Sequence, residues 1–127
     1  MTPTARSLAY LRRLGFIADV CERWIPGACI RRDLFGLFDI VAVDSTDRIF
    51  MIQATTRNHI AHRLKKMEAS PMLAQILRAG VLVEVWGWGQ ARAGKKWTVK
   101  RTPLILVGQK VVEARPLPTS SLCLEIP

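Results

Sequence analysis

Apolar residues recur at three-residue spacing near the start of the chain and predict an amphipathic helix. The recurring positions are Ala5, Leu8, Leu11 and Leu14, which share one helical face. Thr2 is a suitable N-cap, and Pro3 suits the first helical position. Gly15 is a typical residue at which a helix stops. We therefore expect the first helix over residues 3–14.

Runs of apolar and β-branched residues then predict a series of strands separated by turns. The expected strands are 16–25, 37–43, 48–55, 81–88 and 97–101, with a last pair at 104–107 and 111–114. Pro26-Gly27 and Ser45-Thr46-Asp47 are typical of turns. Asp44 and Asp47 are best interpreted as residues of that second turn.

The hydrophobic period changes between residues 57 and 80 and predicts two more helices. The apolar positions of the first are Ile60, Leu64 and Met67, while Lys65 and Lys66 fall largely on the other side. Ser70-Pro71 repeats the capping signal for a second helix that ends at Gly80. The resulting order, α-β-β-β-α-β-β, predicts an α/β protein of the α+β type, with a mixed sheet flanked by helices. We expect one domain over 1–115 and a surface tail over 116–127.

Composition excludes several classes of protein. The chain has 127 residues, of which 50% are hydrophobic and 23% are charged, as in globular domains. No run approaches the roughly 18 apolar residues of a membrane span. A basic protein could still bind a membrane surface, but the sequence lacks a helix with a large apolar face bordered by lysines, so no membrane association is expected. Arg6, Arg12 and Arg13 interrupt the stretch where a secretory signal would need apolar residues. The three cysteines form no CxxC motif, which favours a reducing, cytoplasmic location.

Charge points to an anionic partner, with nucleic acid first. Lys and Arg number 19 against 10 Asp and Glu, a formal net charge of +9. The basic residues gather in segments 48–70 and 91–115, whereas 31–47 is acidic. The expected nucleic-acid contacts are Arg31, Arg32, Arg57, Lys65, Lys66, Lys95 and Lys96. An acidic segment within a basic protein suits a divalent cation that bridges to phosphate.

Two aspartates in the acidic segment differ from the turn residues. Asp33 and Asp39 flank an apolar run, and a carboxylate placed there is costly unless it is paired. Alternation along a strand places Gln53 and Thr55 on one face. If strands 37–44 and 48–55 form a hairpin, Asp39 lies near both.

The segment IRRDLFGLFDIVAVD, followed by RIFMIQATT and a basic helix, resembles the PD-(D/E)XK nuclease superfamily over about residues 5–100. In that superfamily an Asp begins one strand and an acid-x-Lys pair lies on the next. The chain is similar to small phage and bacterial members with a Gln-x-Thr motif, and more distantly to archaeal-type Holliday junction resolvases. The resemblance implies an αβββαβ restriction-endonuclease-like core, followed here by a C-terminal β-hairpin. It also implies Mg²⁺- or Mn²⁺-dependent cleavage of DNA, with branched DNA as a candidate substrate, by a homodimer.

The resemblance also implies roles for particular residues. Asp39 is the expected principal metal ligand, and Gln53 occupies the acidic position, where its amide oxygen can coordinate without charge. Thr55 occupies the lysine position and supplies no cation. Asp33 or Glu22 would then provide the missing carboxylate. Lys65 or Lys66 would provide the missing positive charge.

The Gln-x-Thr motif favours an alternative, a module with this fold that binds nucleic acid without cleaving it. A second open question concerns Trp86, Trp88 and Trp97, which lie among basic residues near Lys95 and Lys96. Such aromatics can stack on the bases of single strands, or they can form a hydrophobic sheet face or dimer contact. His59 and His62 have no third His or Cys ligand nearby, so a zinc site is not expected.

Overall fold

The computed structural model describes residues 1–21, 23–28, 30–92 and 95–115, so the expected tail at 116–127 lies outside the described residues. The elements, in chain order, are α1 (Pro3–Arg13), β1 (Ile17–Val20), β2 (Arg23–Ile25), β3 (Ile30–Arg32), β4 (Ile40–Val43), β5 (Ile49–Thr56), the 3₁₀ helix η1 (Arg57–His59), α2 (Ile60–Glu68), α3 (Leu73–Arg78), β6 (Leu82–Gln90), β7 (Trp97–Val107) and β8 (Lys110–Glu113). None of these described helices is long and apolar enough to cross a membrane.

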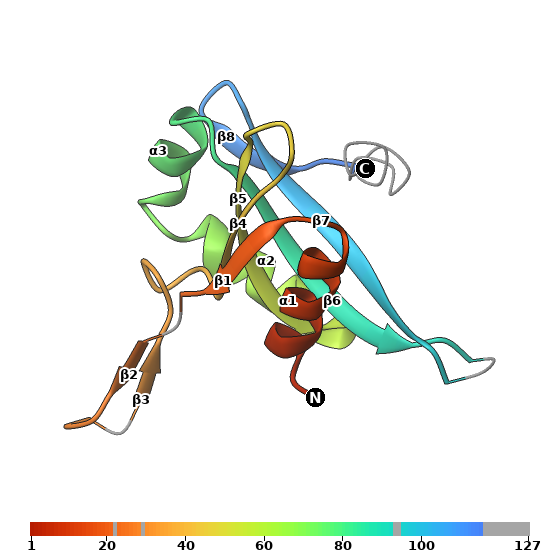
Figure 1. Cartoon of the computed structure of the whole chain (residues 1–127). Coiled ribbons are helices and arrows are strands. Elements are labelled where there is room, and N and C mark those ends of the chain that lie inside the picture. The colour runs from red at the N-terminus through yellow and green to blue at the C-terminus, as the bar shows by residue number, and fades with distance from the viewer. Residues whose placement is uncertain (22, 29, 93–94, 116–127) are drawn as a thin grey trace.

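Six strands form one mixed sheet in the order β1-β4-β5-β6-β7-β8. Neighbouring strands are antiparallel except β5 and β6, which are parallel. A parallel pair needs a long crossover, and the segment containing α2 and α3 supplies it. Figure 1 shows these elements around the twisted sheet. The predicted mixed sheet flanked by helices is therefore confirmed.

A small hairpin near the N-terminus corrects one prediction. The single strand expected over 16–25 is wrong, because β1 ends at Val20 and β2 pairs with β3 in a separate two-stranded sheet. Figure 1 shows this hairpin standing away from the main sheet. Composition alone does not reveal the break, because the residues on both sides of it favour extended backbone equally well. The three residues of β3 are too few to give a period.

The C-terminal strands correct a second prediction. The separate strands expected at 97–101 and 104–107 form one strand, β7, which continues through Pro103. The expected last hairpin is confirmed, because β8 pairs with residues 104–107 of β7. Proline is unusual in a central strand because it lacks the N–H that pairs with a neighbouring strand. In the structure Pro103 still contributes its carbonyl oxygen, which accepts a hydrogen bond from the Ala114 N–H at 2.8 Å.

The sheet has a hydrophobic core on each face. α1 covers one face, where its Leu11 packs with Ile40, Ile52 and Trp86. α2 and α3 cover the other face through Leu64, Met67 and Leu73, among other buried residues. On the α1 side, Trp88 donates from Nε1 to the Ser7 hydroxyl at 2.8 Å. Residues of one strand therefore alternate between two cores, which fixes the face on which each polar residue lies.

Asp44 is a turn residue, as predicted. It is buried, and its Oδ1 accepts hydrogen bonds from the backbone N–H groups of Thr46 and Arg48. The Arg48 guanidinium contacts its Oδ2 at 2.7 Å. Burial tends to raise the pKa of Asp44, but these hydrogen bonds outweigh burial and lower the pKa below 3.8. Its contribution to stability is therefore present above the unfolded-state pKa and is lost as the pH falls through the folded-state value.

Candidate functional site

Asp39 and Gln53 lie side by side on the face of the sheet that α2 covers. Asp39 directly precedes β4, and its backbone N–H donates to the Ile52 carbonyl at 2.9 Å. This extends the β4–β5 register, in which Ile40 pairs with Ile52, by one position. Gln53 donates from Nε2 to Asp39 Oδ2 at 2.8 Å. The predicted proximity of the two side chains is confirmed.

The Asp39 carboxylate is buried and held in place by donors from β5. Asp39 is 4% exposed and Gln53 is 2% exposed. Besides the Gln53 amide, the backbone N–H of Ala54 donates to Asp39 Oδ2 at 2.8 Å. These hydrogen bonds offset the cost of removing the carboxylate from water. Because Gln53 donates through Nε2, this hydrogen bond does not use its amide oxygen, the atom that binds cations.

Thr55 lies on the same strand face, two residues beyond Gln53, and is buried. Its partner in the β5–β6 register is Gly87, above which lies the Ile60 side chain of α2. Thr55 therefore sits where the resemblance expects a lysine, yet it brings only a hydroxyl. The departure noted in the sequence persists in the structure.

Cys21 lies next to Asp39, although no local sequence pattern pointed to it. Its backbone N–H donates to the Asp39 carbonyl at 2.8 Å, and its thiol donates to the Phe38 carbonyl at 3.4 Å. Burial, then the negative charge of Asp39 and that of Asp33, raise the pKa of Cys21 from 9.0 to about 11. Of the two carboxylates, Asp39 affects the thiol more strongly than Asp33 does. Only the β1–β4 register, which the sequence did not define, brings Cys21 beside Asp39.

This cluster gives a prediction about the Cys21 thiol. Asp39→Asn should lower the pKa of Cys21 toward 9.0, because it removes a negative charge that disfavours the thiolate. The pH dependence of alkylation at Cys21, followed by mass spectrometry in a Cys29→Ser, Cys123→Ser background, measures the change.

Asp47→Asn is the matched control and should leave the thiol unchanged. An identical Cys21 titration in Asp39→Asn and the parent would contradict the assigned cluster. When Asp39 is present, the folded state favours the neutral Cys21 thiol, since its pKa is raised from 9.0 to about 11. This contribution to stability is complete below pH 9.0 and is lost as the pH rises through about 11.

The basic residues expected to contact nucleic acid are spread over several elements. Arg32 on β3, Lys65 and Lys66 on α2, and Lys95 and Lys96 before β7 are all exposed. Arg57 of η1 donates to the Thr98 hydroxyl at 2.6 Å and so contacts β7. Arg31 belongs to β3, but its side chain lies outside the described part of the structure. Glu22 also lies outside the described residues.

Arg63 is a basic residue of α2 that the sequence analysis did not select. It is half-buried, unlike the exposed Lys65 and Lys66. Its Nε is buried and has no hydrogen-bond partner among the described residues. A buried, unpaired donor is unusual in a folded protein. Arg63 directly precedes Leu64, one of the apolar positions of α2 that face the core. This position next to the apolar face is the sequence signal that could have identified it.

The donor set at Asp39 fits a magnesium ion only in part. The Asp39 carboxylate and the Gln53 amide supply the hard oxygen atoms that Mg²⁺ prefers, and Mg²⁺ commonly uses only one or two carboxylates with water and phosphate. Within the described ranges, no group of three or more His, Cys, Asp or Glu residues could hold a metal ion. A cation here would therefore depend on a substrate phosphate for part of its coordination.

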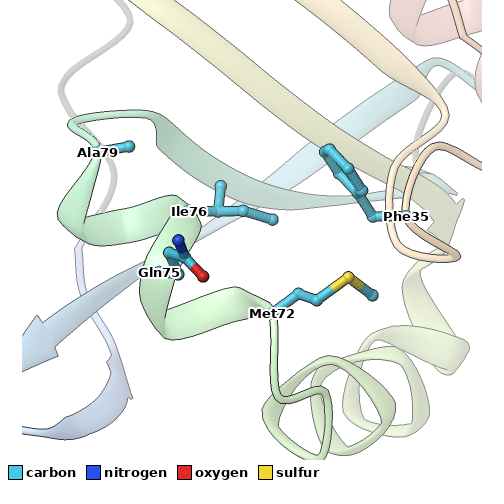
Figure 2. Close-up of a pocket in the computed structure, with 5 residues that line it drawn as sticks. All are labelled: Phe35, Met72, Gln75, Ile76 and Ala79. Carbon is cyan, nitrogen blue, oxygen red and sulfur yellow. The ribbon is translucent and has the colours of Figure 1, made fainter.

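A separate hollow beside α3 is apolar. Its lining residues are Phe35, Met72, Gln75, Ile76 and Ala79. Figure 2 shows Phe35, from the loop before β4, facing the residues of α3 across this hollow. None of the predicted catalytic residues lines it, so we assign it no part in catalysis.

Comparisons of the chain with protein-family models, with curated proteins and with solved structures find no match.

Proposed function

We propose that this protein is a metal-dependent DNA endonuclease with a PD-(D/E)XK-like core, in which Asp39 and Gln53 hold Mg²⁺ or Mn²⁺. The observation that carries the proposal is the placement of these two side chains next to each other, on paired strands and on one face of the sheet. The element order supports it. Without the β2–β3 hairpin and α3, the chain runs α1, β1, β4, β5, α2, β6, with β5 and β6 parallel.

Each residue of the candidate site would have its own role in the expected reaction. The Asp39 carboxylate and the Gln53 amide oxygen would hold the metal, which would polarise a phosphoryl oxygen and promote the deprotonation of water. The Ala54 N–H fixes the orientation of the Asp39 carboxylate. Asp33 is the candidate for a second acidic group. Arg63, the half-buried cation of α2, replaces Lys65 and Lys66 as our candidate for the positive charge that Thr55 does not supply.

A second candidate function is nucleic-acid binding without cleavage. It is favoured by Thr55 at the lysine position and by the hydrogen bonds from Gln53 and Ala54 that already engage Asp39. In that case the Asp39 carboxylate links the start of β4 to β5 through these hydrogen bonds and binds no metal. A homodimer, expected for an enzyme that cuts two strands, stays a prediction for either function.

Cleavage assays distinguish the two functions. The purified protein should cut linear, branched or single-stranded DNA only when Mg²⁺ or Mn²⁺ is present. Asp39→Asn should reduce the rate by about 100-fold or more, because it removes the only charge from the ligand pair. Circular dichroism and thermal melting establish that the variant is folded.

Asp47→Asn is the matched control, since it also removes one carboxylate from the β4–β5 hairpin. Asp47 has a φ of 64°, a conformation that asparagine tolerates well, so this variant should cleave normally. Equal background rates for the wild type and Asp39→Asn on all three substrates would overturn the nuclease. DNA binding that survives in Asp39→Asn and weakens steeply with salt would then favour the binding module.

A further inference from the structure

A groove between α1 and β7, here called the α1–β7 groove, lies on the face of the sheet opposite Asp39 and Gln53. It is lined by Tyr10 and Arg13 of α1, by Lys96, and by Trp97, Val99 and Arg101 of β7, among others. Trp88 also borders it and packs in the α1-side core, whereas Val85, the β6 partner of Gln53, packs in the α2-side core. Figure 1 shows the β6–β7 hairpin extending past α1.

Helical spacing gathers the groove's basic residues on α1. Arg6, Tyr10 and Arg13 stand at i, i+4 and i+7, so they share one helical face. The Arg6 guanidinium lies 3.7 Å from the centroid of the Trp97 ring, and that of Arg13 lies 5.7 Å from the Tyr10 ring. The helix therefore presents two cations and an aromatic ring toward β7.

The groove carries a net positive charge. Arg13 and the exposed Lys96 line it, and Arg6 lies over Trp97 at its border. Arg101 adds no net charge because Glu84 is its ion-pair partner, at 2.6 Å. None of the described residues that line the groove is acidic. An anionic ligand is therefore favoured over a neutral one or a cation.

Of the three tryptophans near the hairpin, Trp97 is the one available to a ligand. Trp86 and Trp88 are 2% and 7% exposed, and their Nε1 atoms donate to Glu84 and Ser7 respectively. Trp97 is 39% exposed. The indole of Trp97 and the Arg6 guanidinium above it form a flat cationic platform, and both kinds of surface stack on nucleic-acid bases.

We propose that the α1–β7 groove binds single-stranded nucleic acid, with bases stacked at Trp97 and Arg6 and phosphates held by Arg13 and Lys96. A single strand fits this combination because its bases are free to stack, whereas those of a duplex are already stacked on one another. The proposal does not rest on the nuclease function, because the groove shares no residue with the Asp39–Gln53 pair.

Fluorescence anisotropy in EDTA tests the groove without any cleavage. The probes are labelled oligo(dT) and oligo(U) of about 12 nucleotides, within the usual site sizes of such proteins. An abasic oligonucleotide and a duplex of equal length complete the set. Oligo(dT), oligo(U) or both should bind at least 10-fold more tightly than the abasic strand and the duplex. The ratio between the first two identifies DNA or RNA as the preferred strand.

Variants on both sides of the groove sharpen the test. Trp97→Ala should weaken single-strand binding by about 5- to 100-fold, the effect of losing one stacked base. Arg13→Ala with Lys96→Ala should reduce the slope of log K against log salt by about 1.4, as expected for two lost phosphate contacts. The matched controls are Trp24→Ala, an exposed tryptophan on β2, and Lys110→Ala on β8, which should bind normally.

Three results would overturn the proposal. The first is equal affinity for the abasic strand and oligo(dT), since that excludes stacking. The second is equal affinity for the duplex. The third is an equal loss of binding in Trp24→Ala and Trp97→Ala. Thermal melting of each variant separates a loss of binding from a loss of fold, and Trp97→Phe, which keeps a stacking ring, should retain most of the affinity.

Discussion

Arg101→Met should lower the free energy of unfolding by about 3–5 kcal/mol, the usual cost of leaving one member of a buried ion pair without its partner. The Arg101 and Glu84 side chains are only 6% and 4% exposed. Arg101 donates from Nε and from a terminal nitrogen to the two Glu84 oxygens at 2.7 and 2.6 Å. Without the guanidinium, the Glu84 carboxylate keeps the hydrogen bond from Trp86 Nε1, at 2.8 Å, but loses the cation that neutralises its charge.

The double variant Glu84→Gln with Arg101→Met separates pairing from packing. It should recover most of the lost stability, because no charge stays buried and the glutamine oxygen can still accept from Trp86. Lys100→Met, at the exposed neighbouring position of β7, is the matched control and should change stability by less than about 0.5 kcal/mol. Urea unfolding with an unchanged m-value measures each difference. Equal losses in the single and double variants would contradict this account.

Gly87→Ala should lower the free energy of unfolding by about 1–3 kcal/mol, as overpacking of a core does. A Cβ at Gly87 would overlap the Ile60 side chain and would approach the Arg57 Cα to 3.1 Å. The Arg57 atom is backbone and Ile60 is buried, so η1 and the start of α2 must shift to make room. Urea unfolding measures the loss of stability, and far-ultraviolet circular dichroism checks that α2 is retained.

Gly89 provides the comparison on the same strand face. A Cβ at Gly89 would meet the Arg57 side chain at 3.4 Å, an ordinary contact. Gly89→Ala should therefore be neutral or slightly stabilising, since it restricts the unfolded chain. In an Ile60→Ala background, Gly87→Ala should cost less, because its main obstacle is gone. Equal effects at Gly87 and Gly89 would contradict the close packing of α2 on β6.

The sequence predicted the elements whose period is long enough to be read. The stripe of Ile60, Leu64 and Met67 indicated α2, and all three side chains are buried. The β2–β3 hairpin was missed because each of its strands has three residues, fewer than a period needs. The strands expected at 97–101 and 104–107 are one strand in the structure, because β7 pairs with β6 and β8 on either side and the pairing with β6 continues through Pro103.

Strand alternation was enough to predict one contact of the site, but not the others. Alternation and the expected hairpin brought Asp39 to Gln53, and the structure confirms that contact. The approach of Cys21 depends on the pairing of β1 with β4, a tertiary contact without a local signal. Strand alternation places Trp86 and Trp88 on one face, but their burial depends on α1, which covers that face in the structure. The chemical roles of Asp39, Gln53 and Thr55 stay predictions.

The hydrogen bond between Trp88 and Ser7 has a consequence for the order in which the two sites assemble. It joins residues 81 positions apart, whereas the Asp39–Gln53 bond spans 14. Contacts that close short loops cost less chain entropy and can form early. The Asp39–Gln53 pair therefore belongs to a hairpin that can form locally, while the α1–β7 groove exists only after the two halves of the chain meet. If α1 detached transiently, the α1–β7 groove would be lost, but the hydrogen bond between Asp39 and Gln53 would remain.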